Sequence, residues 1–359
     1  MVPERAPLPG SSNDEQRTFP RLNADGSADG PSPMSPDQLR EAIGMMLQSR
    51  AIDELAIKLQ RLKRIGLYAP VYGQEAAVVG SSMALDPQRD WMVPASREQP
   101  AMLRHGLPLE NFFAAYMGRL DFAAIPQGVK MLPRQQAIGA QLPQAAGLAW
   151  ALKLRREPGV AMVYCGDGAS SEGDFHESLN LAGVMRSPLI IVAINNGYAI
   201  SVPFHKQTAA ASIADRAIGY GMPGISVDGD DLFAVYAAST AAVARAREGQ
   251  GPSLIECRTY RVGFHNTSDN PNDYRDDAEV QAALARDPVD RVERYVVAAG
   301  ILSEGDLATL KVRIRAELDA VQRHVATLPR PEPDFIFRDI YEELPARLER
   351  QRAEVREAG

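Results

Sequence analysis

Two polar motifs, Gly-Asp-Gly at 166–168 and Asn-Asn at 195–196, have residue types suited to binding a metal ion and a diphosphate. Each motif ends an apolar run rich in strand-forming residues, and 26 residues separate the two motifs. Between them, residues 170–186 carry apolar side chains at a helical spacing. The pattern predicts a right-handed βαβ unit. Its two parallel strands should end at the same edge of a sheet, where open α/β sheets bind ligands.

The oxygen atoms near these motifs suit Mg²⁺, which prefers hard oxygen ligands in near-octahedral geometry. The Asp167 carboxylate, the Asn196 amide oxygen and the backbone carbonyl of Tyr198 are predicted to supply three ligands. Two diphosphate oxygens and a water would complete the shell. Either motif alone is also typical of an ordinary turn at a strand end, and it is the pair at this spacing that favours a metal site.

Backbone amides and an arginine are expected to bind the diphosphate itself. Gly168 lets the backbone come close to a phosphate, and the amides near Ala169 and Ser170 open the predicted helix, where anions bind. Arg97 follows the apolar run at 91–94, which reads as another strand end. Its guanidinium suits a terminal phosphate because it donates in a fork. The alternative is a surface arginine in a salt bridge.

The region around the two motifs resembles a known family. The stretch from 166 to 201, GDGASSEGDFHESLNLAGVMRSPLIIVAINNGYAIS, is similar to the thiamine diphosphate signature of the alpha subunits of 2-oxo acid dehydrogenases, the decarboxylating first component of those complexes. The resemblance runs from about residue 35 to about residue 350 and is closest to bacterial heterotetrameric pyruvate dehydrogenases. Other segments agree with it, at 68–76, 125–133, 138–141, 227–230, 234–236 and 259–265.

The resemblance implies a fold, an activity and partners. It implies thiamine diphosphate and Mg²⁺ as cofactors, and oxidative decarboxylation of pyruvate with transfer of the acyl group to a lipoyl-bearing acyltransferase component. It also implies a beta subunit in an α2β2 heterotetramer, which would hold the aminopyrimidine ring, so the chain alone is expected to be inactive. Three alternatives stay open: a branched-chain 2-oxo acid such as 3-methyl-2-oxobutanoate as substrate, acetoin as substrate, and a catalytically silent scaffold subunit.

The resemblance also assigns roles to individual residues. His265 is expected to contact the diphosphate and to take part in acyl transfer, which suits an imidazole that exchanges a proton near neutral pH. Without the resemblance, a solvated loop histidine would be the better interpretation. Ile138 lies where similar subunits place backbone groups against the aminopyrimidine. Similar subunits have a Tyr-Arg pair at the phosphate, and here Ser96 replaces the tyrosine beside Arg97.

Composition excludes several other classes of protein. There are 39 Lys and Arg against 46 Asp and Glu, for a net charge of −7. This balance argues against a nucleic-acid surface, which needs clustered positive charge. The two cysteines, Cys165 and Cys257, each end an apolar run and are interpreted as buried thiols of a reducing compartment. No apolar stretch reaches membrane-spanning length, and a cytoplasmic protein is expected.

The alternation of strand and helix patterns predicts an α/β fold, a doubly wound parallel sheet flanked by helices. We expect a flexible N-terminal arm at 1–34, a thiamine diphosphate- and Mg²⁺-binding domain at 35–278, and a C-terminal helical segment at 279–359 that packs on that domain or on the partner. The predicted helix at 141–155 is rich in small residues, which serve compact internal packing and subunit interfaces equally. A last helix is predicted at 340–353.

Overall fold

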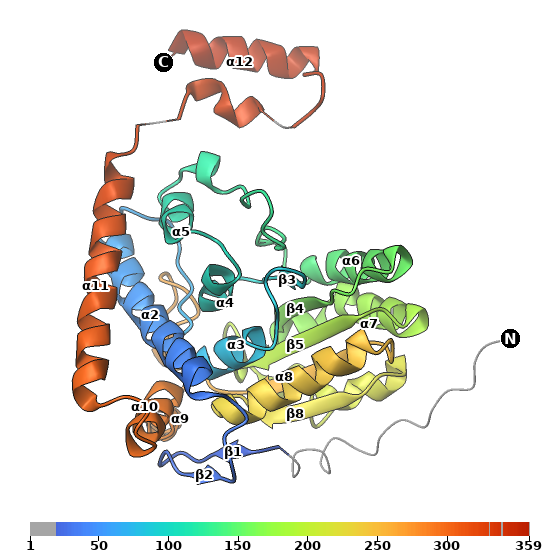
Figure 1. Ribbon diagram of the computed structural model, residues 1–359. Helices are drawn as coiled ribbons and strands as arrows, with labels where there is room; N and C mark the ends of the chain where they lie inside the picture. Colours follow the sequence, from blue (N-terminus) through green and yellow to red (C-terminus); the bar gives the residue numbers. More distant parts are fainter. Residues whose placement is uncertain (1–18, 330, 339, 359) are drawn as a thin grey trace, which may run out of the picture.

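The computed structural model describes residues 19–329, 331–338 and 340–358. Its centre is a parallel sheet with the strand order β3-β4-β5-β9-β8 (Figure 1). The predicted α/β fold with a parallel sheet is confirmed. The strands are β3 (Trp91–Val93), β4 (Ala161–Gly166), β5 (Leu189–Asn195), β8 (Gly224–Asp228) and β9 (Ser253–Arg258).

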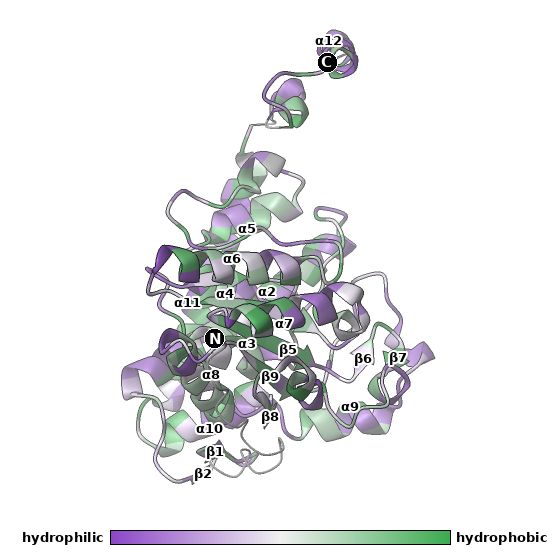
Figure 2. Cartoon of the chain, turned by 90° about the vertical axis from the view of Figure 1, so that its right-hand side faces the viewer, coloured by the Kyte–Doolittle hydropathy of each residue, from purple (hydrophilic) through white to green (hydrophobic). Residues whose placement is uncertain are grey.

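The strands of the sheet are buried on both faces, as expected for parallel strands covered by helices. Alternate residues of β4 belong to different apolar clusters, because successive side chains of a strand point to opposite faces. Ala161, Val163 and Cys165 lie in one cluster, and Met162 and Tyr164 lie in the other. Figure 2 shows hydrophobic residues along the central strands. The sheet therefore separates two apolar cores and contributes side chains to both.

Helices cover both faces of the sheet. One face packs against α6 (Gln141–Arg155) and α7 (Gly173–Met185). The opposite face packs against α3 (Glu75–Ser82) and α8 (Leu232–Arg247), with further helices outside them (Figure 1). The outer helices are α2 (Pro36–Arg61), α4 (Gln99–Arg104), α5 (Leu109–Tyr116), α10 (Pro288–Ala298) and α11 (Glu304–Thr327).

The small residues of α6 serve internal packing. Ala145, Ala146 and Ala149 are fully buried within the chain, in the core that α6 shares with α7 and β4. For these three residues, internal packing is therefore the alternative that holds, of the two that the sequence left open. A capping box begins α2, since Ser35 Oγ accepts from the Gln38 amide at 3.2 Å and Gln38 Oε1 accepts from the Ser35 amide at 2.9 Å.

Residues 1–18 of the predicted N-terminal arm lie outside the described residues. The following residues form a hairpin of β1 (Arg21–Leu22) and β2 (Ala28–Asp29). Leu22 is fully buried, and its amide donates to Asp231 Oδ2 at 3.0 Å. Asp231 is also the N-cap of α8, accepting from the amides of Phe233 and Ala234. The hairpin is thus attached to the α/β body of its own chain.

The C-terminal segment contains α9 (Asp277–Leu284), α10, α11 and α12 (Ala346–Ala358). The last helix was predicted to begin at 340, and that boundary is wrong. Pro345 immediately precedes α12 and disfavours a helical conformation for Leu344 before it. In Figures 1 and 2, α12 lies apart from the α/β body. No helix among the described residues is long and apolar enough to cross a membrane.

Candidate active site

A cavity of about 490 Å³ lies at the carboxyl ends of β4 and β5. Its size is within the range of about 300–1,000 Å³ typical of cofactor and ligand pockets. All the residues predicted from the sequence to belong to the site, except Ser170, line this one cavity: Arg97, Ile138, Asp167, Gly168, Ala169, Asn196, Tyr198 and His265.

The strand register brings the two motifs together. Gly166 at the end of β4 pairs with Ile194 of β5, so the residues that follow each strand lie side by side. Gly166 itself faces open space, because a Cβ atom built there would meet no other atom within 4 Å. Backbone exposed in this way can be approached closely by a ligand. Gly168 is required for a different reason, since its Cβ would lie 2.9 Å from Ala199 Cβ.

Asp167 is a buried carboxyl, and a neighbouring buried oxygen lacks a hydrogen-bond partner among the described residues. It is 2% exposed, and its Oδ2 accepts from Gln207 Nε2 at 2.6 Å. Burial is the main cause that raises its pKa, while the Gln207 hydrogen bond opposes the shift. Gln207 Oε1 is buried beside it and has no hydrogen-bond partner among the described residues. An orphaned oxygen next to a buried carboxylate fits a bound cation with its water, because a cation restores the ionised form.

The two asparagines have different environments. Asn195 Nδ2 donates to the buried Glu256 Oε1 at 2.8 Å, which makes Asn195 a structural residue. Asn196 Nδ2 donates to Gln74 Oε1 at 3.0 Å. Its Oδ1 accepts from the Tyr198 amide at 3.3 Å, which is long for a hydrogen bond. The Asn196 oxygen therefore keeps capacity for a metal ligand bond.

The Tyr198 carbonyl oxygen accepts from Arg261 Nη1 at 3.1 Å, which leaves one of its two lone pairs. Arg261 is 1% exposed and also donates to the Ile200 carbonyl at 2.5 Å and to Tyr274 Oη at 2.7 Å. Ile200 has a φ of 56°, which is rare for a β-branched residue. Arg261 thus stabilises an unusual backbone conformation at the cavity wall, and among the described residues it forms no ion pair with a carboxylate.

Arg97 and His265 lie in direct contact. Arg97 Nη2 is 2.6 Å from the His265 carbonyl oxygen and 3.1 Å from His265 Nδ1, and Arg97 Nη1 donates to the Pro70 carbonyl at 2.6 Å. A guanidinium cannot accept a hydrogen bond, so Nδ1 must be the acceptor. The neutral imidazole therefore carries its proton on Nε2.

His265 is held neutral by its surroundings. Burial is the largest cause, followed by the charges of Arg97 and Arg261, and together they lower its pKa to about 4. Asp269 opposes this shift weakly, and it fixes the backbone because its Oδ2 accepts from the His265 amide at 2.7 Å. The same oxygen accepts from Tyr274 Oη at 2.6 Å. The histidine is thus a fixed neutral donor at the cavity wall.

The Ser170 amide does not have its predicted role. Residues 168–171 form a 3₁₀ turn, and α7 begins only at Gly173. Inside this turn the Ser170 amide and hydroxyl both donate to the Asp167 carbonyl, at 3.0 and 2.7 Å. The Ser170 amide is therefore occupied, which leaves Gly168 and Ala169 as the backbone positions of the turn that line the cavity.

Three polar residues of the site were not predicted from the sequence. Gln74 and Gln207 contact Asn196 and Asp167 from distant parts of the chain. Glu98 is 3% exposed, lines the cavity, and has its pKa raised to about 7, chiefly by burial. Two sequence signals could have found them: Glu98 directly follows Arg97, and Gln74 lies in the segment 68–76 that carries the resemblance, whereas no motif marks Gln207.

A parallel sheet with a buried carboxylate, an amide oxygen and two arginines at its carboxyl edge is typical of an α/β enzyme that binds its ligand at the strand ends. The sequence pattern of the dehydrogenase E1 component matches residues 43–334. The chain belongs to this family of thiamine diphosphate-dependent oxidoreductases.

Relatives from two staphylococcal species are similar over most of the chain. The pyruvate dehydrogenase E1 component subunit alpha of Staphylococcus epidermidis is 40% identical over 319 residues, which cover 89% of this chain and 86% of the relative. The protein of the same name from Staphylococcus aureus strain Mu50 is also 40% identical over 319 residues, with the same coverage. The corresponding protein of strain MRSA252 is 39% identical.

Proposed function

We propose that this chain is the alpha subunit of a pyruvate dehydrogenase first component and binds the diphosphate and Mg²⁺ half of thiamine diphosphate. The observation that carries the proposal is the shared cavity, into which Asp167, Asn196, Arg97 and His265 converge from four separate parts of the sequence. The names of the similar staphylococcal proteins support pyruvate as the substrate. We place this activity in the cytoplasm.

The proposed metal site uses three oxygens. The Asp167 carboxylate, the Asn196 Oδ1 and the Tyr198 carbonyl would hold Mg²⁺, and these are the hard ligands that this ion prefers. The buried, raised-pKa carboxyl of Asp167 and the orphaned Gln207 Oε1 support the assignment. Cation binding would return Asp167 to its ionised form.

Arg97 and the backbone at Gly168 and Ala169 would bind the diphosphate. Three of the five donors of Arg97 are occupied by Pro70 and His265, so its guanidinium is held in place and two N–H groups remain for phosphate oxygens. Ile138, which is 59% exposed at the cavity wall, would place its backbone groups against the aminopyrimidine. Thiamine diphosphate supplies, when bound, the nucleophilic carbon and the electron sink that decarboxylation requires.

His265 would act as a proton donor during acyl transfer to the lipoyl group of the acyltransferase component. Support comes from its neutral form and from the tautomer that Arg97 imposes, which leaves the proton on Nε2. A fixed donor at a reacting centre needs no reorganisation at the moment of reaction.

We further propose that a beta subunit completes the site in an α2β2 assembly. The similar proteins are named as alpha subunits, which supports a partner of this kind. Because the ring must be oriented and desolvated before it can react, half a site gives little catalysis.

A substrate profile of the co-expressed alpha and beta chains tests the proposal. Pyruvate, 3-methyl-2-oxobutanoate and acetoin would be compared by reduction of an artificial electron acceptor, with Asp167→Ala as the inactive control. We expect the largest kcat/KM for pyruvate. Preference for 3-methyl-2-oxobutanoate would make the chain a branched-chain subunit instead, and no cofactor-dependent turnover with any of the three would contradict the proposed function.

A further inference from the structure

The segment 68–74, between α2 and α3, contacts two residues of the proposed cofactor site. Its Pro70 carbonyl accepts from Arg97 Nη1 at 2.6 Å, and its Gln74 Oε1 accepts from Asn196 Nδ2 at 3.0 Å. One short segment thus touches the proposed phosphate ligand and the proposed metal ligand. The position of the segment consequently sets the position of both.

Gln74 controls the orientation of the Asn196 amide. Gln74 is 1% exposed, and the hydrogen bond to Asn196 is buried. The two ends of an asparagine amide have nearly the same shape, so only their partners decide which end is the oxygen. An acceptor at Nδ2 fixes the nitrogen toward Gln74 and directs Oδ1 away from it. A metal ligand requires the oxygen, so this contact selects the conformation that can bind a cation.

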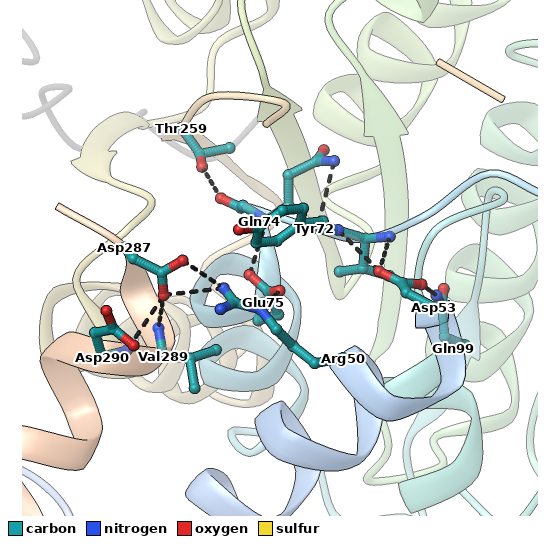
Figure 3. A network of polar contacts seen from close by, with 12 residues as sticks. Arg50, Asp53, Tyr72, Gln74, Glu75, Gln99, Thr259, Asp287, Val289 and Asp290 are labelled. Carbon is teal, nitrogen blue, oxygen red and sulfur yellow. Dashed lines mark hydrogen bonds and ion pairs between the residues drawn. The ribbon is translucent and has the colours of Figure 1, made fainter. Parts of the chain in front are cut away.

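A buried carboxyl of α2 anchors the start of the segment. Asp53 is 4% exposed, and its Oδ2 accepts from the amides of Val71 and Tyr72 at 2.9 and 3.1 Å (Figure 3). Its Oδ1 accepts from Tyr68 Oη at 2.6 Å and from Gln99 Nε2 at 3.1 Å. Four donors on one carboxyl leave the segment little freedom to move.

The end of the segment is fixed as firmly. Glu75 is fully buried, its Oε2 accepts from the Gly73 amide at 3.0 Å, and its Oε1 accepts from Arg50 Nε at 2.8 Å (Figure 3). The Gly73 carbonyl accepts from Thr259 Oγ1 at 2.6 Å. Gly73 has a φ of +92°, and a Cβ there would lie 2.3 Å from the Tyr260 carbonyl oxygen, so only glycine fits. Gln74 is held between two anchored residues.

We propose that Gln74 is a positioning residue for the metal site, and that Asp53 is the anchor that keeps Gln74 in place. Gln74 presents the Asn196 amide oxygen to the cation without binding the cation itself. This inference rests on the proposed function, because it assumes that Asn196 is a metal ligand. Outer partners of metal ligands typically contribute about 10–100-fold to metal affinity.

Paired substitutions at Gln74 test the proposal in the co-expressed alpha and beta chains. Gln74→Met keeps the length of the side chain but removes the acceptor, whereas Gln74→Glu keeps an acceptor for Asn196 Nδ2. The probe is Mn²⁺ in the presence of thiamine diphosphate, with free Mn²⁺ measured by electron paramagnetic resonance. We expect Gln74→Met to weaken Mn²⁺ binding about 10–100-fold, and Gln74→Glu to bind Mn²⁺ at least as tightly as the wild type.

Thermal unfolding of the same samples distinguishes a positioning role of Gln74 from a role in stability alone. We expect the metal-free Gln74→Met protein to stay folded with a modestly lower thermal midpoint, since one buried N–H of Asn196 loses its acceptor, so that a loss of Mn²⁺ affinity is not a loss of the fold. Wild-type Mn²⁺ affinity in Gln74→Met would overturn the proposal, and so would equal losses in Gln74→Met and Gln74→Glu. Failure of the wild type to bind Mn²⁺ with thiamine diphosphate would instead contradict the proposed function.

Asp53→Asn tests the anchor, because an amide nitrogen cannot accept from the donors that surround Asp53. We expect weaker Mn²⁺ binding, and a double variant with Gln74→Met that loses less than the product of the two single losses, since both act through one segment. Glu54→Gln is the matched control on α2. Its carboxylate is 67% exposed and 3.7 Å from Arg315, and a surface pair of this kind contributes little. If the Mn²⁺ affinity of the double variant falls by the full product of the two single losses, Asp53 does not act through Gln74 and is not its anchor.

Discussion

Replacing Arg97 with lysine should weaken cofactor binding although the charge is kept. Arg97 bridges the Pro70 carbonyl and the His265 carbonyl, each at 2.6 Å, and contacts His265 Nδ1 at 3.1 Å. A single shorter ammonium that stays on these carbonyls cannot also offer the two remaining N–H groups to phosphate oxygens, so at least one charge-assisted bond to the diphosphate is lost. Such a bond contributes about 1.5–3 kcal/mol. At about 1.4 kcal/mol per tenfold change, the affinity for thiamine diphosphate should fall about 10–150-fold.

Calorimetric titration of thiamine diphosphate into the co-expressed alpha and beta chains, at saturating Mg²⁺, measures this change. Arg323→Lys is a matched control, because Arg323 is exposed on α11 and its substitution alters the same chemistry away from the cavity. The control should bind with wild-type affinity. An Arg97→Lys affinity within about twofold of the wild type would show that the fork of donors is not used, and would refute the reasoning.

Three further predictions concern the cavity. Asp167→Ala or Asn196→Ala should abolish cofactor-dependent activity while circular dichroism stays unchanged, and normal activity at saturating Mg²⁺ would contradict the metal site. His265→Ala should impair acyl transfer to a lipoyl domain more than decarboxylation with an artificial acceptor, whereas equal losses would assign His265 to cofactor binding alone. Burial raises the pKa of Glu98 to about 7, above its ordinary value of 4.5, so its contribution to stability is present below pH 4.5 and is lost as the pH rises through 7. Thermal midpoints of Glu98→Gln should therefore fall less than those of the wild type as the pH rises from about 5 to about 7, and parallel curves would refute this.

Local patterns in the sequence were sufficient for the elements that carry the cofactor motifs. The apolar runs at 160–165 and 189–194 correspond to β4 and β5, and the predicted helix at 141–155 has the bounds of α6. β4 and β5 are uninterrupted apolar runs that end at glycine and asparagine, and the buried residues of α6 recur at a helical spacing. The adjacency of β4 and β5 followed from the short βαβ connection.

Elements without a period were not predicted. Every residue of α3 (Glu75–Ser82) is buried, so it has no polar face to reveal a helical spacing. Met46, on the apolar side of α2, is fully buried in the core of its own chain. A single chain offers no signal that distinguishes an internal apolar face from an interface.

The partners of the proposed metal ligands also could not be predicted. Gln74 lies 122 residues before Asn196, and Gln207 lies 40 residues after Asp167. Glutamine side chains have no distinctive spacing, and these two reach their partners only after the sheet and its connections have formed. The sequence predicted which groups would touch the cofactor, and tertiary structure was needed to find the residues that contact those groups.

Decarboxylation of pyruvate by the purified chain, alone and co-expressed with a beta partner, tests the central claim most directly. The claim is that this chain contains the diphosphate and Mg²⁺ half of a thiamine diphosphate site, and that the half is inactive by itself. We predict no turnover by the chain alone and thiamine diphosphate-dependent turnover by the co-expressed pair. Robust turnover by the chain alone would contradict the two-subunit account, and an inactive pair that binds no thiamine diphosphate would contradict the assigned site.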